Sequence, residues 1–181
     1  MSPLAHAPHK RQFVNVPLRT QDGRRVRFYD DLVRDRAVVI SFMYTRCNGS
    51  CPLTSGKLAQ LQETLGDRLG RDLTFLSITL DPDHDRPAEL KEYAASYGAR
   101  NGWIFLTGSR EDVEALRRNL GVRDLDPAID RDRSQHGTVL TFGNDRTGRW
   151  AALPALGSVA FLAAAIQRIT EPPLTTLSSS R

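Results

Sequence analysis

One short, continuous apolar segment constrains the fold more than any other part of the chain. Residues 37–43 read Ala-Val-Val-Ile-Ser-Phe-Met and do not alternate strictly between apolar and polar positions. Such a run is expected of a strand in the middle of a sheet, where other elements cover both faces. The sequence therefore predicts a layered α/β fold with this strand near the centre of the sheet.

Strand-like and helix-like patterns alternate along the rest of the chain. The Asp22-Gly23 pair between two apolar segments predicts an opening β-hairpin, because a tight hairpin turn needs residues that accept a positive φ. Further strands are predicted at 73–80, 103–106, 138–142 and 149–153, and helices after Cys51 and at 87–97, 109–121 and 158–169. This order predicts a mixed central sheet with helices on both faces, which a thioredoxin-like sandwich fits best.

Length and composition indicate one ordinary globular domain. A chain of 181 residues with 40% hydrophobic content can bury one sizeable core. We expect flexible tails at 1–12 and 171–181, which leaves 13–170 as the domain. The formal charge is +4, but the arginines are scattered among acidic residues and form no basic stripe with aromatic residues, so we expect no nucleic-acid partner.

Two cysteines follow the central strand in the segment 47–52, which reads Cys-Asn-Gly-Ser-Cys-Pro. Proline is accepted early in a helix, so Cys51 should lie at a helix N-terminus, where the dipole and free amides favour a thiolate. A spacing of four residues along a helix places both side chains on one side, within reach of a reversible disulfide. The sequence therefore predicts a redox-active pair or a metal site, in preference to two inert core thiols.

A metal site needs a third ligand, because two thiolates alone leave a protein site incomplete. His136 is the leading candidate, since it stands at the entry to a predicted strand after a charged loop that could approach the cysteines. Two thiolates and an imidazole suit Cu(I), and the same set can hold Cu(II) or Zn(II). A loop histidine without function remains the alternative. The segment 81–85, which includes His84, is interpreted as turn chemistry and not as catalysis.

Taken together, these segments resemble the Sco/SenC family over about residues 13–169. The resemblance lies in the segment 42–52, in the Asp-Pro-Asp-His-Asp turn at 81–85 with Tyr93 downstream, and in His136 before a strand that leads to 145–148. It implies a thioredoxin-like fold and a copper site, for Cu(I) or Cu(II), made by Cys47, Cys51 and His136.

The same resemblance implies a function, partners and a location. The expected function is that of a copper-binding metallochaperone and thiol-redox factor, and not that of a metabolic enzyme. The expected partners are a copper-receiving protein, either cytochrome c oxidase or a related copper protein, and a thiol reductant. Family members usually work outside the cytoplasm, so we expect a periplasmic or otherwise extracytoplasmic location. The chain itself shows no signal-peptide core and no apolar run of the roughly eighteen residues that a membrane span needs.

The sequence departs from the family pattern at two places near the proposed ligands. Asn48-Gly49-Ser50 stands between the cysteines, where proline and an acidic residue are common, and Gly137 follows His136 where serine is frequent. The changed loop could alter thiol pKa, copper affinity or choice of partner.

Three other functions compete with copper delivery. A thiol–disulfide oxidoreductase would use Cys47 and Cys51 without metal, since exchange needs only a low-pKa thiolate and a resolving thiol. A peroxidase is disfavoured because Tyr44 occupies the place, three residues before the first cysteine, where threonine or serine would position peroxide. A structural interaction module would leave both cysteines idle.

Overall fold

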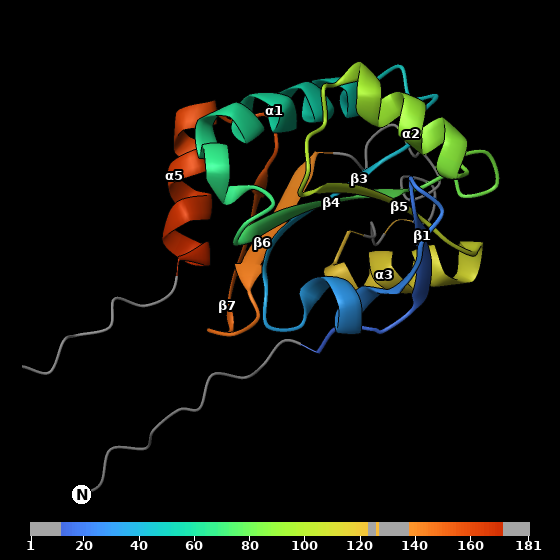
Figure 1. Ribbon diagram of the computed structural model, residues 1–181, viewed down its shortest axis with the longest axis horizontal. Coiled ribbons are helices and arrows are strands. Elements are labelled where there is room, and N and C mark those ends of the chain that lie inside the picture. The colour runs from blue at the N-terminus through green and yellow to red at the C-terminus, as the bar shows by residue number, and fades with distance from the viewer. Residues whose placement is uncertain (1–11, 123–125, 127–137, 172–181) are drawn as a thin grey trace, which may run out of the picture.

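A mixed sheet of seven strands runs through the centre of the described chain, in the order β2-β1-β5-β4-β3-β6-β7 (Figure 1). The structure is a computed structural model that describes residues 12–122, 126 and 138–171. The strands are β1 (Pro17–Thr20), β2 (Arg25–Arg27), β3 (Ala37–Met43), β4 (Leu73–Thr79), β5 (Trp103–Thr107), β6 (Val139–Asn144) and β7 (Arg149–Pro154). Strands β3, β4 and β5 are parallel, and the other neighbouring pairs are antiparallel.

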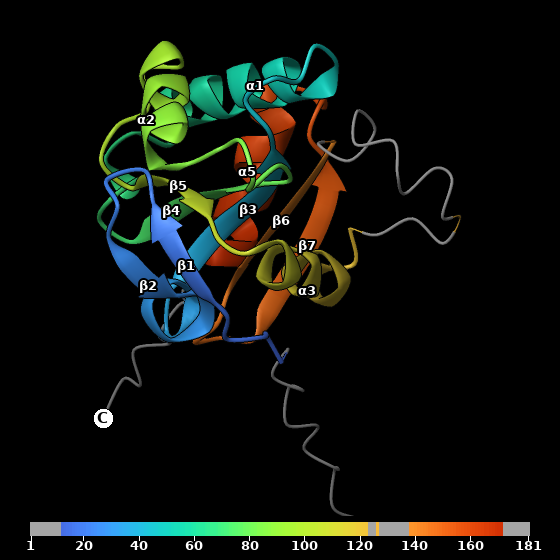
Figure 2. The ribbon, with the colours of Figure 1, turned by 90° about the vertical axis from the view of Figure 1, so that its right-hand side faces the viewer.

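Helices cover both faces of this sheet (Figures 1 and 2). They are α1 (Ser50–Leu65), α2 (Pro87–Ser96), α3 (Arg110–Leu120) and α5 (Val159–Thr170), with a short π-helix η1 (Phe28–Val33) and a 3-10 turn η2 (Gly66–Arg68). Helices α1, α2 and α5 pack on one face, and η1 and α3 pack on the other. The predicted thioredoxin-like sandwich is confirmed.

Strand β3 separates two hydrophobic layers, and its side chains contribute to both. Ala37, Val39 and Met43 pack toward α1 and α5, whereas the alternate residues Val38 and Ile40 pack toward η1 and α3. All seven residues of β3 are buried, as its unbroken apolar pattern predicts. Packing on both faces therefore fixes the position of the carboxyl end of β3, where the cysteine loop begins.

The helix boundaries follow local sequence signals. Ser109 caps α3 by accepting a hydrogen bond from the amide of Asp112, and α3 ends at Gly121, which has a φ of 73°. Ser158 caps α5 in the same way through the amide of Phe161. Both helices begin where the sequence predicts them. The predicted tails fall almost entirely on 1–11 and 172–181, outside the described residues, so the domain boundaries stay a prediction.

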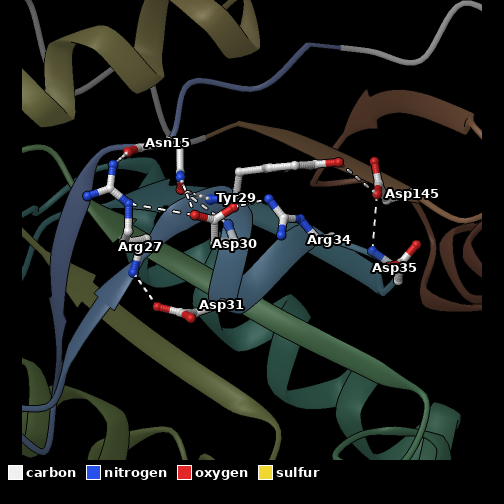
Figure 3. Close-up of polar contacts among 8 residues, drawn as sticks. All are labelled: Asn15, Arg27, Tyr29, Asp30, Asp31, Arg34, Asp35 and Asp145. Atoms are coloured by element: carbon white, nitrogen blue, oxygen red, sulfur yellow. Dashed lines mark hydrogen bonds and ion pairs between the residues drawn. The ribbon is translucent and has the colours of Figure 1, made fainter.

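The π-helix η1 is the main element that the sequence pattern did not predict. Its first turn is held by Asn15, whose side-chain oxygen accepts hydrogen bonds of 3.1 Å from the amides of Tyr29 and Asp30 (Figure 3). The amide group of Asn15 also donates to the Asp30 carboxylate at 2.6 Å. These are contacts between residues about fifteen positions apart, so no local periodicity reveals them. Strand β1 follows Asn15 closely and begins at Pro17.

A second polar anchor fixes the turn before β3. Asp145 is buried, and its carboxylate accepts hydrogen bonds from the Tyr29 hydroxyl at 3.2 Å and the Asp35 amide at 3.0 Å (Figure 3). Asp35 has a φ of 57°, a left-handed conformation that few residues other than glycine adopt. The Asp145 carboxylate therefore holds the chain in an otherwise unfavourable bend that leads into the central strand.

We predict that Asn15→Ala lowers the free energy of unfolding by about 1–2 kcal/mol, because two amides at the start of η1 lose their acceptor. Urea unfolding followed by circular dichroism measures the change. Glu92→Ala, on the exposed side of α2, is the control and should change stability by less than about 0.5 kcal/mol. Equal stabilities of the two variants would contradict the role given to Asn15.

Candidate metal centre

The two cysteines lie at the junction between β3 and α1. Cys47 ends a tight turn in which its amide donates to the carbonyl of Tyr44 at 3.2 Å, and Cys51 is the second residue of α1. Gly49 is the residue that precedes the helix. Cys51 therefore lies at a helix N-terminus, as predicted from Pro52. Both thiols are free and buried, with Cys47 5% and Cys51 0% exposed.

Hydrogen bonding makes Cys47 the more acidic thiol. Burial alone would raise the pKa of Cys47, but a hydrogen bond from the Cys51 thiol opposes burial. The backbone of Gly49 and of Cys51 and the Tyr44 hydroxyl stabilise the thiolate further, so the Cys47 pKa lies below the ordinary thiol value. A buried thiol that reacts needs this kind of support.

Cys51 has the opposite character. Burial raises the pKa of Cys51 to about 12, and the hydrogen bond to Cys47 and the negative charge of its thiolate act in the same direction. As the pH rises, the pair therefore loses its first proton from Cys47, while Cys51 is still a thiol. This division of roles suits either an attacking and a resolving thiol or two sulfur ligands that lose the second proton to a bound metal.

Tyr93 of α2 forms part of the wall beside Cys51. Its hydroxyl lies 2.9 Å from the hydroxyl of Ser55, which is one helical turn beyond Cys51 on α1. Burial first, and then the neighbouring Tyr97 and Cys51, raise the pKa of Tyr93, so its phenol stays protonated at neutral pH. Ser55 was missed by sequence reasoning, and only its position four residues after Cys51 could have indicated it.

The turn between β4 and α2 holds the cysteine loop in place. Asp85 is fully buried, and its carboxylate accepts hydrogen bonds from the Thr45 amide at 2.9 Å, the Thr45 hydroxyl at 2.5 Å and the Thr79 hydroxyl at 2.6 Å. Thr45 lies two residues before Cys47, so Asp85 fixes the start of the cysteine loop against β4. The sequence identified this segment as a turn, but not the contact that it makes.

His136 lies outside the described residues. The first described residue after it, Thr138, accepts a hydrogen bond from the Ala155 amide at 2.6 Å. Strand β6 follows and is antiparallel to β3, so β6 begins at the sheet end where β3 leads into the cysteine loop. Within the described ranges no cluster of three His, Cys, Asp or Glu side chains could hold a metal ion. The role of His136 as third ligand therefore remains a prediction.

The sequence matches the SCO1/SenC family over residues 7–171. The chain belongs to the SCO1/SenC family. The SCO1 protein homologue of Bacillus subtilis is 31% identical over 96 residues, which make up 52% of this chain and 48% of that protein. The chain thus spans about half the length of the relatives it matches.

Two solved structures show the same fold. A SCO1/SenC family lipoprotein from Bacillus anthracis has a TM-score of 0.73 and 23% identity, over 92% of this chain and 99% of that one. Yeast Sco1 with copper bound has a TM-score of 0.66 and 23% identity, over 87% of this SCO1/SenC chain and 92% of the yeast one. None of the helices in the described residues combines the length and apolar character that a membrane-spanning segment requires.

We predict that one equivalent of iodoacetamide modifies Cys47 before Cys51. The Cys47 pKa is lowered, so its thiolate is already present at a pH where Cys51 is still protonated, and the rate should fall as the pH drops through the Cys47 pKa. Peptide mass spectrometry of the reduced protein locates the label. In Cys47→Ser the remaining thiol should react slowly at neutral pH. Preferential labelling of Cys51 would reverse this assignment of roles.

Asp85→Ala should lower the free energy of unfolding by about 3 kcal/mol, because two partly buried donors of Thr45 and the buried Thr79 hydroxyl lose their acceptor. The same variant should expose the cysteine loop, so Cys47 should also be alkylated faster. Asp83→Ala, in the same turn but exposed, is the matched control and should leave both properties nearly unchanged. Chemical unfolding and alkylation rates measure the two effects. An Asp85→Ala variant as stable as the control would refute the structural role of this carboxylate.

Proposed function

We propose that this protein is a copper-binding metallochaperone and thiol-redox factor whose ligands are Cys47, Cys51 and His136. The observation that carries the proposal is the buried thiol pair at the start of α1, in which one sulfur is stabilised as a thiolate by its neighbours. A helix N-terminus and an aspartate-fixed loop hold both sulfurs in the same small region. Pairs of this kind bind soft metals tightly or exchange disulfides.

Copper fits this donor set better than a hard cation does. Two sulfur donors favour Cu(I), and an added imidazole allows Cu(II). Both thiols are buried, so water molecules cannot supply the oxygen ligands that a hard cation needs. The Asp85 carboxylate is already engaged by Thr45 and Thr79. The yeast relative whose fold this chain shares binds copper, which supports the same ligand here.

A partner protein that receives the copper is the natural occupant of the surface around the site. Four large apolar side chains of the described residues are exposed, namely Leu53, Val139, Leu156 and Phe161. Leu53 lies in the first turn of α1, and the other three lie at the start of β6, after β7 and in the first turn of α5. The sheet pairing places the start of β6 and the end of β7 at the cysteine end, and Leu53 follows Cys51 by two residues. Contact through this apolar rim would exclude water during transfer.

We further propose cytochrome c oxidase, or a related copper protein, as the receiving partner and an extracytoplasmic location. Membership of the SCO1/SenC family supports both, and the family lipoprotein with the same fold supports the location. A thiol reductant would be needed to return an oxidised pair to two thiols. The loop Asn48-Gly49-Ser50 leaves room for a client that differs from that of other members.

A thiol–disulfide oxidoreductase is the second candidate, favoured by the unequal pKa values of the two thiols. The Cys47 thiolate would attack a partner disulfide, form a mixed disulfide and release one partner thiolate. Cys51 would then give up its proton and attack the Cys47 sulfur, which releases the second partner thiolate. The pair ends as a disulfide and the partner as a dithiol, so two electrons pass to the partner.

Copper titration of the reduced protein tests the proposal. Competition with a chromophoric Cu(I) chelator should give one Cu(I) per chain, and Cys47→Ser or Cys51→Ser should weaken binding by roughly a hundredfold or more, because a hydroxyl replaces a soft sulfur ligand. His136→Ala should weaken binding and change the Cu(II) absorption spectrum. His84→Ala, in the exposed turn, is the histidine control and should bind copper normally.

The outcomes separate the two functions. Undiminished copper binding and an unchanged spectrum in His136→Ala would remove that residue from the site. Rapid reduction of insulin disulfides, with no measurable copper affinity, would replace the copper proposal by the oxidoreductase one.

A further inference from the structure

A cavity lies on the side of the sheet that carries α2, and neither cysteine lines it. Its volume is about 560 Å³, within the range of roughly 300–1,000 Å³ that small-molecule sites occupy. It is bounded by the hairpin strands β1 and β2, the start of α2, and the junction between β5 and α3. The polar residues considered below are Arg19, Arg25, Arg86, Thr107, Ser109 and Asp112.

Three of these residues form a row across neighbouring strands. Arg25 of β2 lies directly opposite Arg19 of β1, and Arg19 lies directly opposite Thr107 of β5. Residues opposite one another in a sheet point to the same face, and like charges in such positions repel. The hairpin therefore maintains an unfavourable pair of guanidinium groups at the cavity wall, which a bound anion would neutralise.

The cationic groups of the cavity are not neutralised by the protein. Among the described residues, neither Arg19, Arg25 nor Arg86 takes part in an ion pair, whereas nearby Arg110 pairs with Asp83. The cavity has one carboxylate, that of Asp112, which accepts a hydrogen bond of 2.6 Å from the Ser109 hydroxyl. Three arginines against one engaged carboxylate leave the cavity positively charged.

The Thr107 hydroxyl is an independent sign of a missing ligand. Thr107 is only 5% exposed, and its hydroxyl has no hydrogen-bond partner among the described residues. A buried polar group without a partner is uncommon in folded proteins and calls for an explanation. Its place in the row with Arg19, on the cavity wall, gives one, because a ligand oxygen there would accept its hydrogen.

The cavity also occupies a position that favours ligand binding. Helix α2 precedes β5 on one face of the sheet, and α3 follows β5 on the other face (Figures 1 and 2). Ligands of open α/β sheets bind beyond the carboxyl ends of strands where the connections change face. At the junction between β5 and α3, Gly108 lies so close to β1 that a Cβ there would come within 2.7 Å of Leu18 Cδ2. The backbone thus packs directly on the hairpin beside the arginines.

We propose that this cavity binds a small organic anion, with a phosphate or carboxylate group held by Arg19, Arg25, Arg86 and the Thr107 hydroxyl. Pro17, Pro82 and Pro87 supply apolar walls, so the anionic group should be carried on an apolar body. None of these residues is a proposed copper ligand, and the site does not depend on the copper function.

Thermal unfolding and calorimetric titration of the reduced full chain test this site with phenyl phosphate, benzoate and inorganic phosphate. Phenyl phosphate or benzoate at about 10 mM should raise the Tm, because it binds only the folded state. Stronger binding by one of the two identifies the preferred anionic group. Inorganic phosphate should bind more weakly, and equal binding would overturn the requirement for an apolar body.

Matched variants distinguish binding at this cavity from a general effect of positive surface charge. Arg19→Gln and Arg86→Gln should each weaken binding about tenfold, and Thr107→Val severalfold, since each removes a group that contacts the anion. Without ligand, Arg19→Gln should be at least as stable as the unsubstituted protein, because the repulsion with Arg25 is gone. Arg24→Gln, an exposed arginine of the same hairpin outside the cavity, should bind normally. No Tm shift with any probe, or equal loss of binding in Arg24→Gln, would overturn the proposal.

Discussion

A buried carboxylate is tolerated only where hydrogen bonds replace the water that it loses, and Asp85 meets this condition through three donors. Two of them belong to Thr45, at the start of the cysteine loop, and the third belongs to Thr79, the last residue of β4. One side chain thus joins the cysteine loop to the neighbouring strand. The position of Cys47, and hence its contact with Cys51, depends on this junction as well as on the hydrophobic layer to which both cysteines belong.

The two thiols differ because they receive different hydrogen bonds, although both are buried. Cys47 collects donors from the loop backbone, from Tyr44 and from Cys51, whereas Cys51 faces the apolar layer and the phenol of Tyr93. Copper binding and disulfide exchange both begin with the thiolate that results. The same local structure therefore suits either chemistry.

The sequence predicted those parts of the molecule that follow from local patterns. The seven buried residues of β3, the starts of α3 and α5 and the helix N-terminus at Cys51 all rest on signals within a few positions. The contacts of Asn15 with η1 and of Asp85 with Thr45 join residues far apart in the chain, so periodicity could not reveal them. The cavity lined by arginines was hidden for the same reason, since it forms only when two strands place Arg19 and Arg25 side by side.

The short connection at 81–86 contributes to two places. Asp81 and Asp85 contact the cysteine loop, whereas Pro82 and Arg86 line the cavity that contains Arg19 and Arg25. Connections between elements usually accept insertions readily, and folds diversify through them. Here one added residue would displace the aspartate and the arginine together. We therefore expect related sequences to differ in this connection by substitutions and to keep its length. Insertions and deletions are expected in other connections.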